Sequence, residues 1–274
     1  MKITFIFILF IYNCSTFTAK KDPFVKDSED HYRVCFWNVK NLSEKGLKKS
    51  GKGQMIIEFA KNCDVISFME VRSANVDMAA AFEKGFQEHG ADYICMEGDP
   101  KGKEDSTRTE KYLACVRKEF ADDIEKHEFE DKNNDFARAP TFFLFSGIKK
   151  ILVVPFHSTP GDRNELIQFQ KVADFATRNF SDRKIFLGGD FNTGKRYQKP
   201  DFLASLTYFV YMNQLIREAT TFGDQKHDLI FTDAVLAKQC KGKVWRLDEF
   251  FPEIDGRKEL EKISDHFPVS AECK

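Results

Sequence analysis

Eight short apolar runs of β-forming residues recur along the chain, and they constrain its fold more than any other feature of the sequence. They are Val34–Trp37, Val65–Met69, Tyr112–Val116, Thr141–Phe145, Ile151–Phe156, Ile185–Leu187, Leu229–Thr232 and Phe267–Ala271. Several runs are continuously apolar rather than alternating, which is typical of strands that are covered on both faces of a sheet. The chain must therefore also supply layers that cover these sheets.

Three segments between the runs have the spacing of amphipathic helices. They are Gln54–Lys61, Asp77–His89 and Glu165–Asn179, and each places its apolar residues on one side. The predicted strands and helices interleave without strict alternation, which favours a layered α/β sandwich over a doubly wound sheet or a barrel. The charged stretch Lys118–Asp135 is expected to be a solvated loop region.

The first residues have the layout of a secretory signal peptide. Met1–Lys2 is basic, Ile3–Tyr12 is an unbroken apolar run too short to span a bilayer, and Asn13–Ala19 is small and polar. We therefore expect a signal peptide over residues 1–19 and a single domain over residues 20–274, because no linker divides the rest. A buried N-terminal strand is the alternative, and Cys14 matches a lipoprotein site poorly. These features predict an exported monomer with no stable membrane association.

Six cysteines follow the predicted signal peptide, at positions 35, 63, 95, 115, 240 and 273. An even number of cysteines in an exported chain permits disulfides, but their pairing cannot be read from the sequence. Cys35 and Cys115 lie inside strand-like runs, where buried free thiols are equally compatible with the pattern. The chain has no C-x-x-C pair, so a zinc site is not expected.

The charges of the chain nearly cancel, with 42 Lys and Arg residues against 43 Asp and Glu residues. A protein that coats nucleic acid non-specifically carries a clear basic excess. Any contact with nucleic acid must therefore be local, and a metal ion would have to supply much of the positive charge at a phosphate.

Polar side chains suited to bind a metal ion lie next to the ends of the predicted strands. They are Asn38, Glu70, Asp190, Asn192 and Asp265. Antiparallel pairing would bring strand starts and strand ends to one edge of a sheet. Carboxylate and amide oxygens are ligands for Mg²⁺, Mn²⁺ or Ca²⁺ rather than for zinc.

Two histidines also lie beside strand ends, His157 after one strand and His266 before the last. Histidine can donate or accept a proton near neutral pH, and a carboxylate that fixes its tautomer improves this role. Each polar residue taken alone is also compatible with a cap, a turn or a surface position. One shared hydrolytic site explains all of them together better than a series of independent coincidences.

These residues belong to motifs by which the chain resembles the endonuclease/exonuclease/phosphatase superfamily and, within it, deoxyribonuclease I. The similarity extends from about Arg33 to Ala271. The motifs are Phe36-Trp37-Asn38, Phe68-Met69-Glu70-Val71-Arg72, Glu110-Lys111-Tyr112-Leu113, Phe136-Ala137-Arg138-Ala139-Pro140, Phe156-His157-Ser158-Thr159-Pro160, Gly189-Asp190-Phe191-Asn192, His227-Asp228-Leu229-Ile230 and Ile263-Ser264-Asp265-His266-Phe267-Pro268-Val269. The resemblance implies a four-layered α/β sandwich, in which two central mixed β-sheets are flanked by helices.

The resemblance also implies a metal site at one edge of the sandwich. Glu70 would be the principal ligand, with Asn38, Asp190 and Asp265 nearby. Mg²⁺ is the expected ion, Mn²⁺ would also suit the site, and Ca²⁺ remains an alternative as a structural ion. The calcium sites that stabilise mammalian members are not recognisable, so calcium dependence is predicted to be lost.

By the same resemblance, two acid–base pairs would carry out the hydrolysis. Glu110 would orient His157, and Asp228 would orient His266. Asn192 would hold the phosphate together with Asn38, and Asp190 would take part in catalysis as well as in metal binding. Attack by water in line with the 3′ oxygen would leave a 5′-phosphate end. Which histidine is the acid and which the base stays open.

Three arginines are the expected contacts to DNA. The resemblance places Arg72 in the minor groove and Arg138 on a phosphate. Arg108 stands where the family has a minor-groove tyrosine, which leaves the groove preference open because an arginine can stack or bind phosphate. The structural disulfides of the family are not reproduced either.

The sequence thus predicts a secreted, metal-dependent endodeoxyribonuclease. Two alternatives remain: a phosphatase or phospholipase C-like phosphodiesterase acting on inositol phosphate or sphingomyelin, and a non-catalytic DNA-binding relative. Arg72, Arg138 and the Glu110–His157 pair favour DNA as the substrate. A lipid substrate would be favoured by an apolar hairpin for membrane insertion, and the sequence shows no obvious one. The complete set of core residues argues against a non-catalytic protein.

Overall fold

The computed structural model describes residues 31–49, 51–72, 76–101, 109–147, 149–197 and 212–274. The expected signal peptide over residues 1–19 lies outside the described residues, and so does Arg108.

The first sheet contains six strands, which are β1 (Tyr32–Leu42), β2 (Val65–Val71), β3 (Tyr93–Glu97), β4 (Lys111–Arg117), β11 (Cys240–Val244) and β12 (Val269–Cys273). Their order across the sheet is β11-β12-β1-β2-β4-β3. β1 and β2 are parallel, and the other neighbours are antiparallel. The parallel pair therefore brings the carboxyl-terminal halves of β1 and β2 to the same edge.

The second sheet also contains six strands, which are β5 (Ala121–Glu128), β6 (Thr141–Gly147), β7 (Ile151–His157), β8 (Lys184–Asp190), β9 (Met212–Gln214) and β10 (Asp228–Asp233). Their order is β5-β6-β7-β8-β10-β9. Here β7 and β8 are the parallel pair, and their neighbours are antiparallel.

Helices cover the outer faces of the two sheets. They are α1 (Glu44–Lys48), α2 (Lys52–Ala60), α3 (Met78–Glu88), α4 (Arg163–Asn179), α6 (Leu247–Phe250) and α7 (Arg257–Leu260). The 3₁₀-helix η2 (Leu236–Lys238) instead packs Leu236 into the apolar core between the sheets. The longest of the helices is α4, and Asp162 precedes it and accepts hydrogen bonds from the amides of Asn164 and Glu165 as its N-cap. Among the described residues, none of the helices combines the length and hydropathy that crossing a membrane requires.

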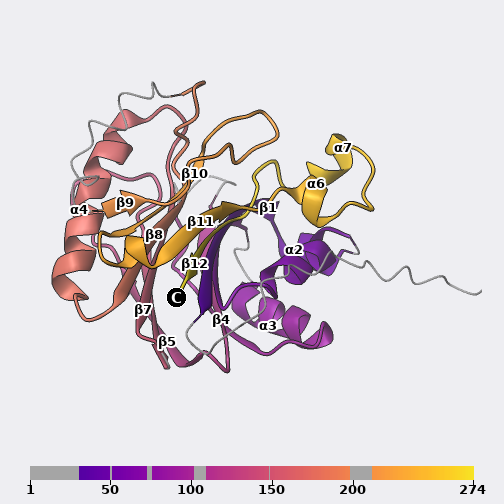
Figure 1. The fold of residues 1–274 in the computed structure, drawn as a ribbon, viewed down its shortest axis with the longest axis horizontal. Helices are drawn as coiled ribbons and strands as arrows, with labels where there is room; N and C mark the ends of the chain where they lie inside the picture. Colours follow the sequence, from indigo (N-terminus) through magenta and orange to yellow (C-terminus); the bar gives the residue numbers. More distant parts are fainter. Residues whose placement is uncertain (1–30, 50, 73–75, 102–108, 148, 198–211) are drawn as a thin grey trace, which may run out of the picture.

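Three apolar cores separate four layers (Figure 1). The central core lies between the sheets and includes Phe36 and Phe143. Phe169 of α4 packs in a second core against the outer face of the second sheet. Phe59 of α2 and Phe82 of α3 pack in a third core against the outer face of the first sheet. The predicted four-layered α/β sandwich with two mixed sheets is confirmed.

All eight predicted strands and all three predicted helices are present, although the last strand begins at Val269 rather than at Phe267. The expectation of a loop over Lys118–Asp135 is wrong, because this segment contains β5. The strand pairs only with β6, at the edge of the second sheet. Most of its described side chains are exposed, while Ile124 is buried in the central core. An edge strand with so many charges has no apolar run to reveal it.

The six cysteines form three disulfides, Cys35–Cys63, Cys95–Cys115 and Cys240–Cys273. Two of these join residues that are direct partners in neighbouring strands, β3 with β4 and β11 with β12. This resolves the choice left open by the sequence, since Cys35 and Cys115 are not free thiols. All three bridges lie in or next to the first sheet.

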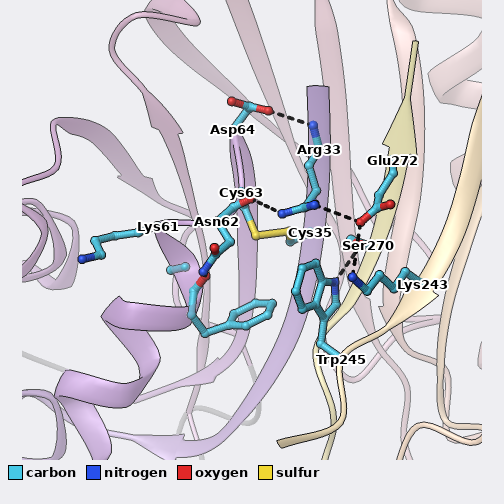
Figure 2. Close-up of a disulfide and its surroundings, with 12 residues drawn as sticks. Arg33, Cys35, Lys61, Asn62, Cys63, Asp64, Lys243, Trp245, Ser270 and Glu272 are labelled. Atoms are coloured by element: carbon cyan, nitrogen blue, oxygen red, sulfur yellow. Dashed lines mark hydrogen bonds and ion pairs between the residues drawn. A yellow bond between two sulfur atoms is a disulfide. The ribbon is translucent and has the colours of Figure 1, made fainter. Parts of the chain in front are cut away.

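The Cys35–Cys63 bridge lies beside an ionic network at the start of β1 (Figure 2). Arg33 donates its backbone amide to Asp64 at 2.8 Å, and its guanidinium pairs with Glu272 of β12 at 3.0 Å. The bridge and the network together attach β1 to the residues before β2 and to β12. They help to fix the register of β1 against its neighbouring strands, and therefore the position of the second half of β1, which contains Asn38.

Candidate active site

The register of the strands brings most of the predicted site residues to one edge of the sandwich. In the second sheet, His157 at the end of β7 and Asp228 at the start of β10 are both direct partners of Asp190 at the end of β8. In the first sheet, Asn38 of β1 lies beside Glu70 of β2. The edge expected from the sequence is therefore formed by residues of both sheets.

Two glycines before Asp190 let the two sheets approach each other closely. A Cβ atom on Gly188 would lie 2.6 Å from the ring of Phe36 in the opposite sheet. Gly189 has φ of 133°, a conformation that other residues rarely adopt. The result is a direct hydrogen bond between the sheets, in which Asn38 Nδ2 donates to Asp190 Oδ2 at 3.0 Å.

The Glu70 carboxylate is held on both oxygens by a turn at the end of β1. Asn38 Nδ2 donates to Glu70 Oε1, and the Asn41 amide donates to Oε2, each at 2.9 Å. Lys40, Asn41 and Glu70 all have positive φ angles, which cost of order 1–3 kcal/mol each. Lys52 Nζ of α2 donates to the carbonyl of Lys40 at 2.8 Å and so supports this turn.

The first acid–base pair is buried and is shared with an arginine. His157 Nδ1 and Arg138 Nε lie 2.8 Å and 2.7 Å from the same oxygen, Glu110 Oε1. Burial alone would raise the pKa of Glu110, but the hydrogen bond and charge of His157 and the charge of Arg138 lower it. Burial lowers the pKa of His157, yet the hydrogen bond and charge of Glu110 outweigh it, so this pKa is raised. The Tyr112 hydroxyl accepts the His157 amide at 3.0 Å and fixes the backbone.

The second pair has the same contact but different surroundings. His266 Nδ1 lies 2.8 Å from Asp228 Oδ2. The other oxygen, Asp228 Oδ1, is buried and has no hydrogen-bond partner in the described structure. Burial raises the pKa of Asp228 to about 6. For His266, burial acts to lower the pKa, but the charges of Asp228 and Asp190 raise it to about 10.

The two histidines converge on one oxygen atom. His157 Nε2 and His266 Nε2 both lie 3.6 Å from Asp190 Oδ2. His157 Nε2 is also 3.9 Å from Glu70 Oε1. Burial would raise the pKa of Asp190, but the charges of both histidines lower it. The paired imidazoles therefore present their second nitrogen atoms to a common, anionic centre.

This centre includes a group of residues able to bind a metal ion. Asp190, Asp228 and His266 each offer one ligand atom, and these atoms lie within 4.8 Å of one another. Of the ligands expected from the sequence, Asp190 belongs to this group, and Asn38 bonds to it directly. Asp265 is half exposed and pairs with Lys40 at 3.5 Å. The chain thus contains a candidate divalent-metal site.

Three of the predicted phosphate and DNA contacts, Asn192, Arg72 and Arg138, lie at the same edge. Asn192 has φ of 48°, and its Nδ2 donates to the Ser158 carbonyl at 2.9 Å. Arg138 Nη2 and Arg72 Nε are buried atoms without a hydrogen-bond partner in the described part of the chain. Each of these two arginines therefore has one donor whose hydrogen-bonding capacity is unused within the described residues.

Several residues that support the site were not singled out from the sequence. Ser264 Oγ donates to the Asn38 carbonyl at 2.7 Å and accepts the His266 amide at 3.0 Å. Trp37 Nε1 donates to the His266 carbonyl at 3.1 Å. Both residues lie within the family motifs, Trp37 next to Asn38 and Ser264 next to Asp265. Their position beside predicted site residues is the sequence signal that could have identified them. They join the last loop to β1, across the edge.

Comparison with known proteins gives related sequences and folds. Deoxyribonuclease-1-like 2 of Mus musculus is 24% identical over 257 residues, which cover 88% of this chain and 91% of that protein. Deoxyribonuclease-1-like 1 of Cricetulus griseus is 24% identical over 176 residues, covering 62% of this chain and 57% of that protein's length. The 3′ phosphatase NExo from Neisseria, solved with a product DNA hairpin, has a similar fold, with a TM-score of 0.62 at 16% identity, covering 89% of this chain and 99% of that one.

The model of the Endonuclease/Exonuclease/phosphatase family matches residues 35–266. This range begins in β1 and ends at His266, so it contains both histidine–carboxylate pairs and the candidate metal site. The chain belongs to the endonuclease/exonuclease/phosphatase family.

Proposed function

We propose that this protein is a secreted, divalent-metal-dependent endodeoxyribonuclease that cleaves DNA to leave 5′-phosphate ends. The observation that carries the proposal is the convergence of two carboxylate-bound imidazoles on Asp190, each with Nε2 at 3.6 Å from Oδ2. Hydrolysis of a phosphodiester requires a base for the attacking water and an acid for the departing oxygen. Two histidines that face one centre supply both.

The donor set fits a hard cation, Mg²⁺ or Mn²⁺. Carboxylate oxygens predominate at the centre, and the buried Asp228 Oδ1 has no hydrogen-bond partner among the described residues. We assign Glu70, Asn38, Asp190 and Asp265 as the ligand side chains, with Asp228 at the border of the site. When bound, the ion would stabilise negative charge on the phosphate oxygens.

The protein's own groups would position the reaction. Glu110 and Asp228 hold the Nδ1 atoms of their histidines, so that the Nε2 atoms of His157 and His266 exchange protons with water and with the 3′ oxygen. Asn192, tied to the Ser158 carbonyl, would orient the phosphate together with Asn38.

DNA is the proposed substrate because donors for phosphate surround the centre. Arg138 Nη2 and Arg72 Nε lack a partner among the described residues and would bind backbone phosphates of the substrate. Arg108, outside the described residues, is proposed as a third contact. The related deoxyribonucleases support the same substrate class.

Export is part of the proposal, with residues 20–274 as one domain and residues 1–19 as its signal peptide. Three disulfides are typical of proteins that fold in an oxidising compartment.

Plasmid relaxation with Mg²⁺ tests the proposal. We expect the purified protein to nick supercoiled DNA, and EDTA, His157→Ala or Glu70→Ala to abolish nicking, while Arg178→Ala on the exposed face of α4 leaves it unchanged. If the protein released phosphate from inositol phosphates, or the headgroup from sphingomyelin, and did not nick DNA, the proposed DNA substrate would be wrong and the released compound's parent would be the substrate.

A further inference from the structure

A pocket of about 260 Å³ opens beside the catalytic centre, on the side of His266 and Asn192. Its wall also includes His227, Arg196 and Tyr197, none of which belongs to the acid–base pairs or to the metal ligands. The pocket is smaller than the cavities of roughly 300–1,000 Å³ that hold drug-sized ligands. Its size therefore suits one small unit of a longer substrate.

His227 is held in one protonation form by the backbone. It is only 7% exposed, and the amide of Gly194 donates to its Nδ1 at 3.1 Å. Because Nδ1 accepts, the ring is neutral and carries its proton on Nε2. A Cβ atom on Gly194 would lie 2.6 Å from the His227 ring, so glycine is needed for this contact. The ring centre lies 5.7 Å from that of His266.

A cation and an aromatic ring lie next to this histidine. The Tyr197 ring is 5.4 Å from the His227 ring, and the Arg196 guanidinium is 5.6 Å from the Tyr197 ring. A turn fixes them, since the Tyr197 amide donates to the Gly194 carbonyl at 2.8 Å and the Arg196 amide donates to Gln225 Oε1 at 3.2 Å. The pocket thus combines a guanidinium, an imidazole N–H and a ring face.

Two carboxylates also line the pocket, but each already has a cation. Glu261 pairs with Arg257 at 2.7 Å, and Asp265 pairs with Lys40 at 3.5 Å. Their charges are therefore largely compensated. An anion at Arg196 and His227 would not face an uncompensated negative charge.

We propose that this pocket binds the nucleotide adjoining the scissile phosphodiester, a refinement that rests on the proposed nuclease function. Arg196 and the Nε2–H of His227 would bind its phosphate, and the Tyr197 ring would stack on its base. A base inside a duplex is already stacked on its neighbours, so this contact requires an unpaired nucleotide. The protein would therefore cleave single-stranded or locally opened DNA in preference to a paired duplex.

A comparison of a long and a minimal substrate tests this pocket. We measure kcat/KM with Mg²⁺ on tetrathymidylate, which has flanking nucleotides, and on methyl 4-nitrophenyl phosphate, which has none. Arg196→Met and Tyr197→Leu should lower the ratio of the two values by tenfold or more. Arg178→Met removes the same charge from an exposed site on α4 and should leave the ratio within twofold of the wild type.

His227 gives a second, independent variant. His227→Gln keeps an acceptor for the Gly194 amide and a donor for phosphate. It should therefore lower the ratio of kcat/KM for the two substrates less than His227→Leu does, when the two variants have equal thermal stability. If the wild type cleaves DNA but Arg196→Met and His227→Leu change both substrates equally, the pocket is not a nucleotide site. If the wild type nicks plasmid but does not cleave tetrathymidylate, the pocket proposal fails, and if it does not nick plasmid either, the proposed nuclease function itself fails.

Discussion

The two histidine–carboxylate pairs have the same contacts and different electrostatic surroundings. In each pair, Nδ1 lies 2.8 Å from a carboxylate oxygen and Nε2 lies 3.6 Å from Asp190 Oδ2. Glu110, however, also binds Arg138 at 2.7 Å, whereas Asp228 has one buried oxygen without a hydrogen-bond partner in the described structure. The energetic cost of burying the charged carboxylate is therefore compensated in the first pair and only partly compensated in the second.

The pKa directions of the carboxylates express this difference. Burial acts to raise both, but His157 and Arg138 lower the pKa of Glu110, whereas that of Asp228 rises to about 6. The metal-capable group includes the second pair and not the first. Arg138 compensates the charge of Glu110, whereas Asp228 has no arginine partner of this kind in the described structure. We therefore propose that a bound cation compensates Asp228 and that the second pair borders the metal site.

The largest predicted effects concern the histidines themselves. His157→Gln and His266→Gln should each lower kcat for DNA cleavage by about 10²–10⁴-fold, the usual contribution of general acid–base catalysis. The double variant should lose little more than the worse single variant, because both groups serve one transition state. Steady-state rates of all three variants check this. Losses that multiply would show that the two pairs act in independent steps.

The next effect is on stability, and it should differ in size between the two pairs. Glu110→Gln leaves the Arg138 guanidinium without its charge partner at a side chain only 18% exposed, and should lower the free energy of unfolding by about 2–4 kcal/mol. Asp228→Asn removes a charge that burial disfavours, but also the carboxylate that stabilises the protonated His266, so it should lower the free energy of unfolding by less than Glu110→Gln does, although activity is lost. Urea denaturation in EDTA measures both.

A double variant isolates the role of the arginine. Glu110→Gln with Arg138→Met removes both charges, and should recover more than half of the stability that Glu110→Gln loses. Equal destabilisation by Glu110→Gln and Asp228→Asn would remove the contrast between the pairs.

The pH dependence of the metal-free protein gives a smaller effect. The pKa of His266 is about 10 in the folded protein against 6.5 as the reference value. The folded state binds this proton more tightly, so the stabilisation is complete below pH 6.5 and is lost as the pH rises through 10. The pKa of Asp228 is raised from 3.8 to about 6, so this residue adds a loss of stability of the same sign as the pH rises from 3.8 to 6. His266→Gln should reduce the fall in Tm between pH 7 and 10 by about 2–4 °C, as measured by calorimetry in EDTA. If His266→Gln left the change of Tm with pH unaltered, the raised pKa of His266 would be contradicted.

Much of this site was predictable because its residues sit where the chain has strong local signals. Gly-Gly-Asp-Phe-Asn follows an apolar run. Gly188 is required by the close approach of β8 to Phe36, and Gly189 by its φ of 133° and its contact with the Phe156 carbonyl. Asp228 precedes another such run and pairs with Asp190 in the register. Strand ends are visible in the sequence, and pairing brings them together.

Other features depend on contacts that no local pattern encodes. The disulfide partners follow from which strands are neighbours, and β5 has no apolar run because its outer face is charged. His227 stands in a motif next to Asp228, and no local pattern encodes its hydrogen bond with the amide of Gly194, 33 residues away. The support of Glu70 by Lys52 likewise crosses from α2 to the end of β1.

Lys52 provides the smallest and sharpest test, because it acts on Glu70, a proposed metal ligand close to His157. Its hydrogen bond to the Lys40 carbonyl supports the turn that donates the Asn41 amide to Glu70, and one such bond contributes about 0.5–1.5 kcal/mol. Lys52→Met should therefore raise the Mg²⁺ concentration at half-maximal activity, and at half-maximal thermal stabilisation, by about two- to tenfold. Lys52→Arg keeps a cationic donor and should restore both values. A lower Mg²⁺ requirement in Lys52→Met would mean that the site responds to the charge of Lys52 beside Glu70 and Asp265, rather than to the turn that it holds.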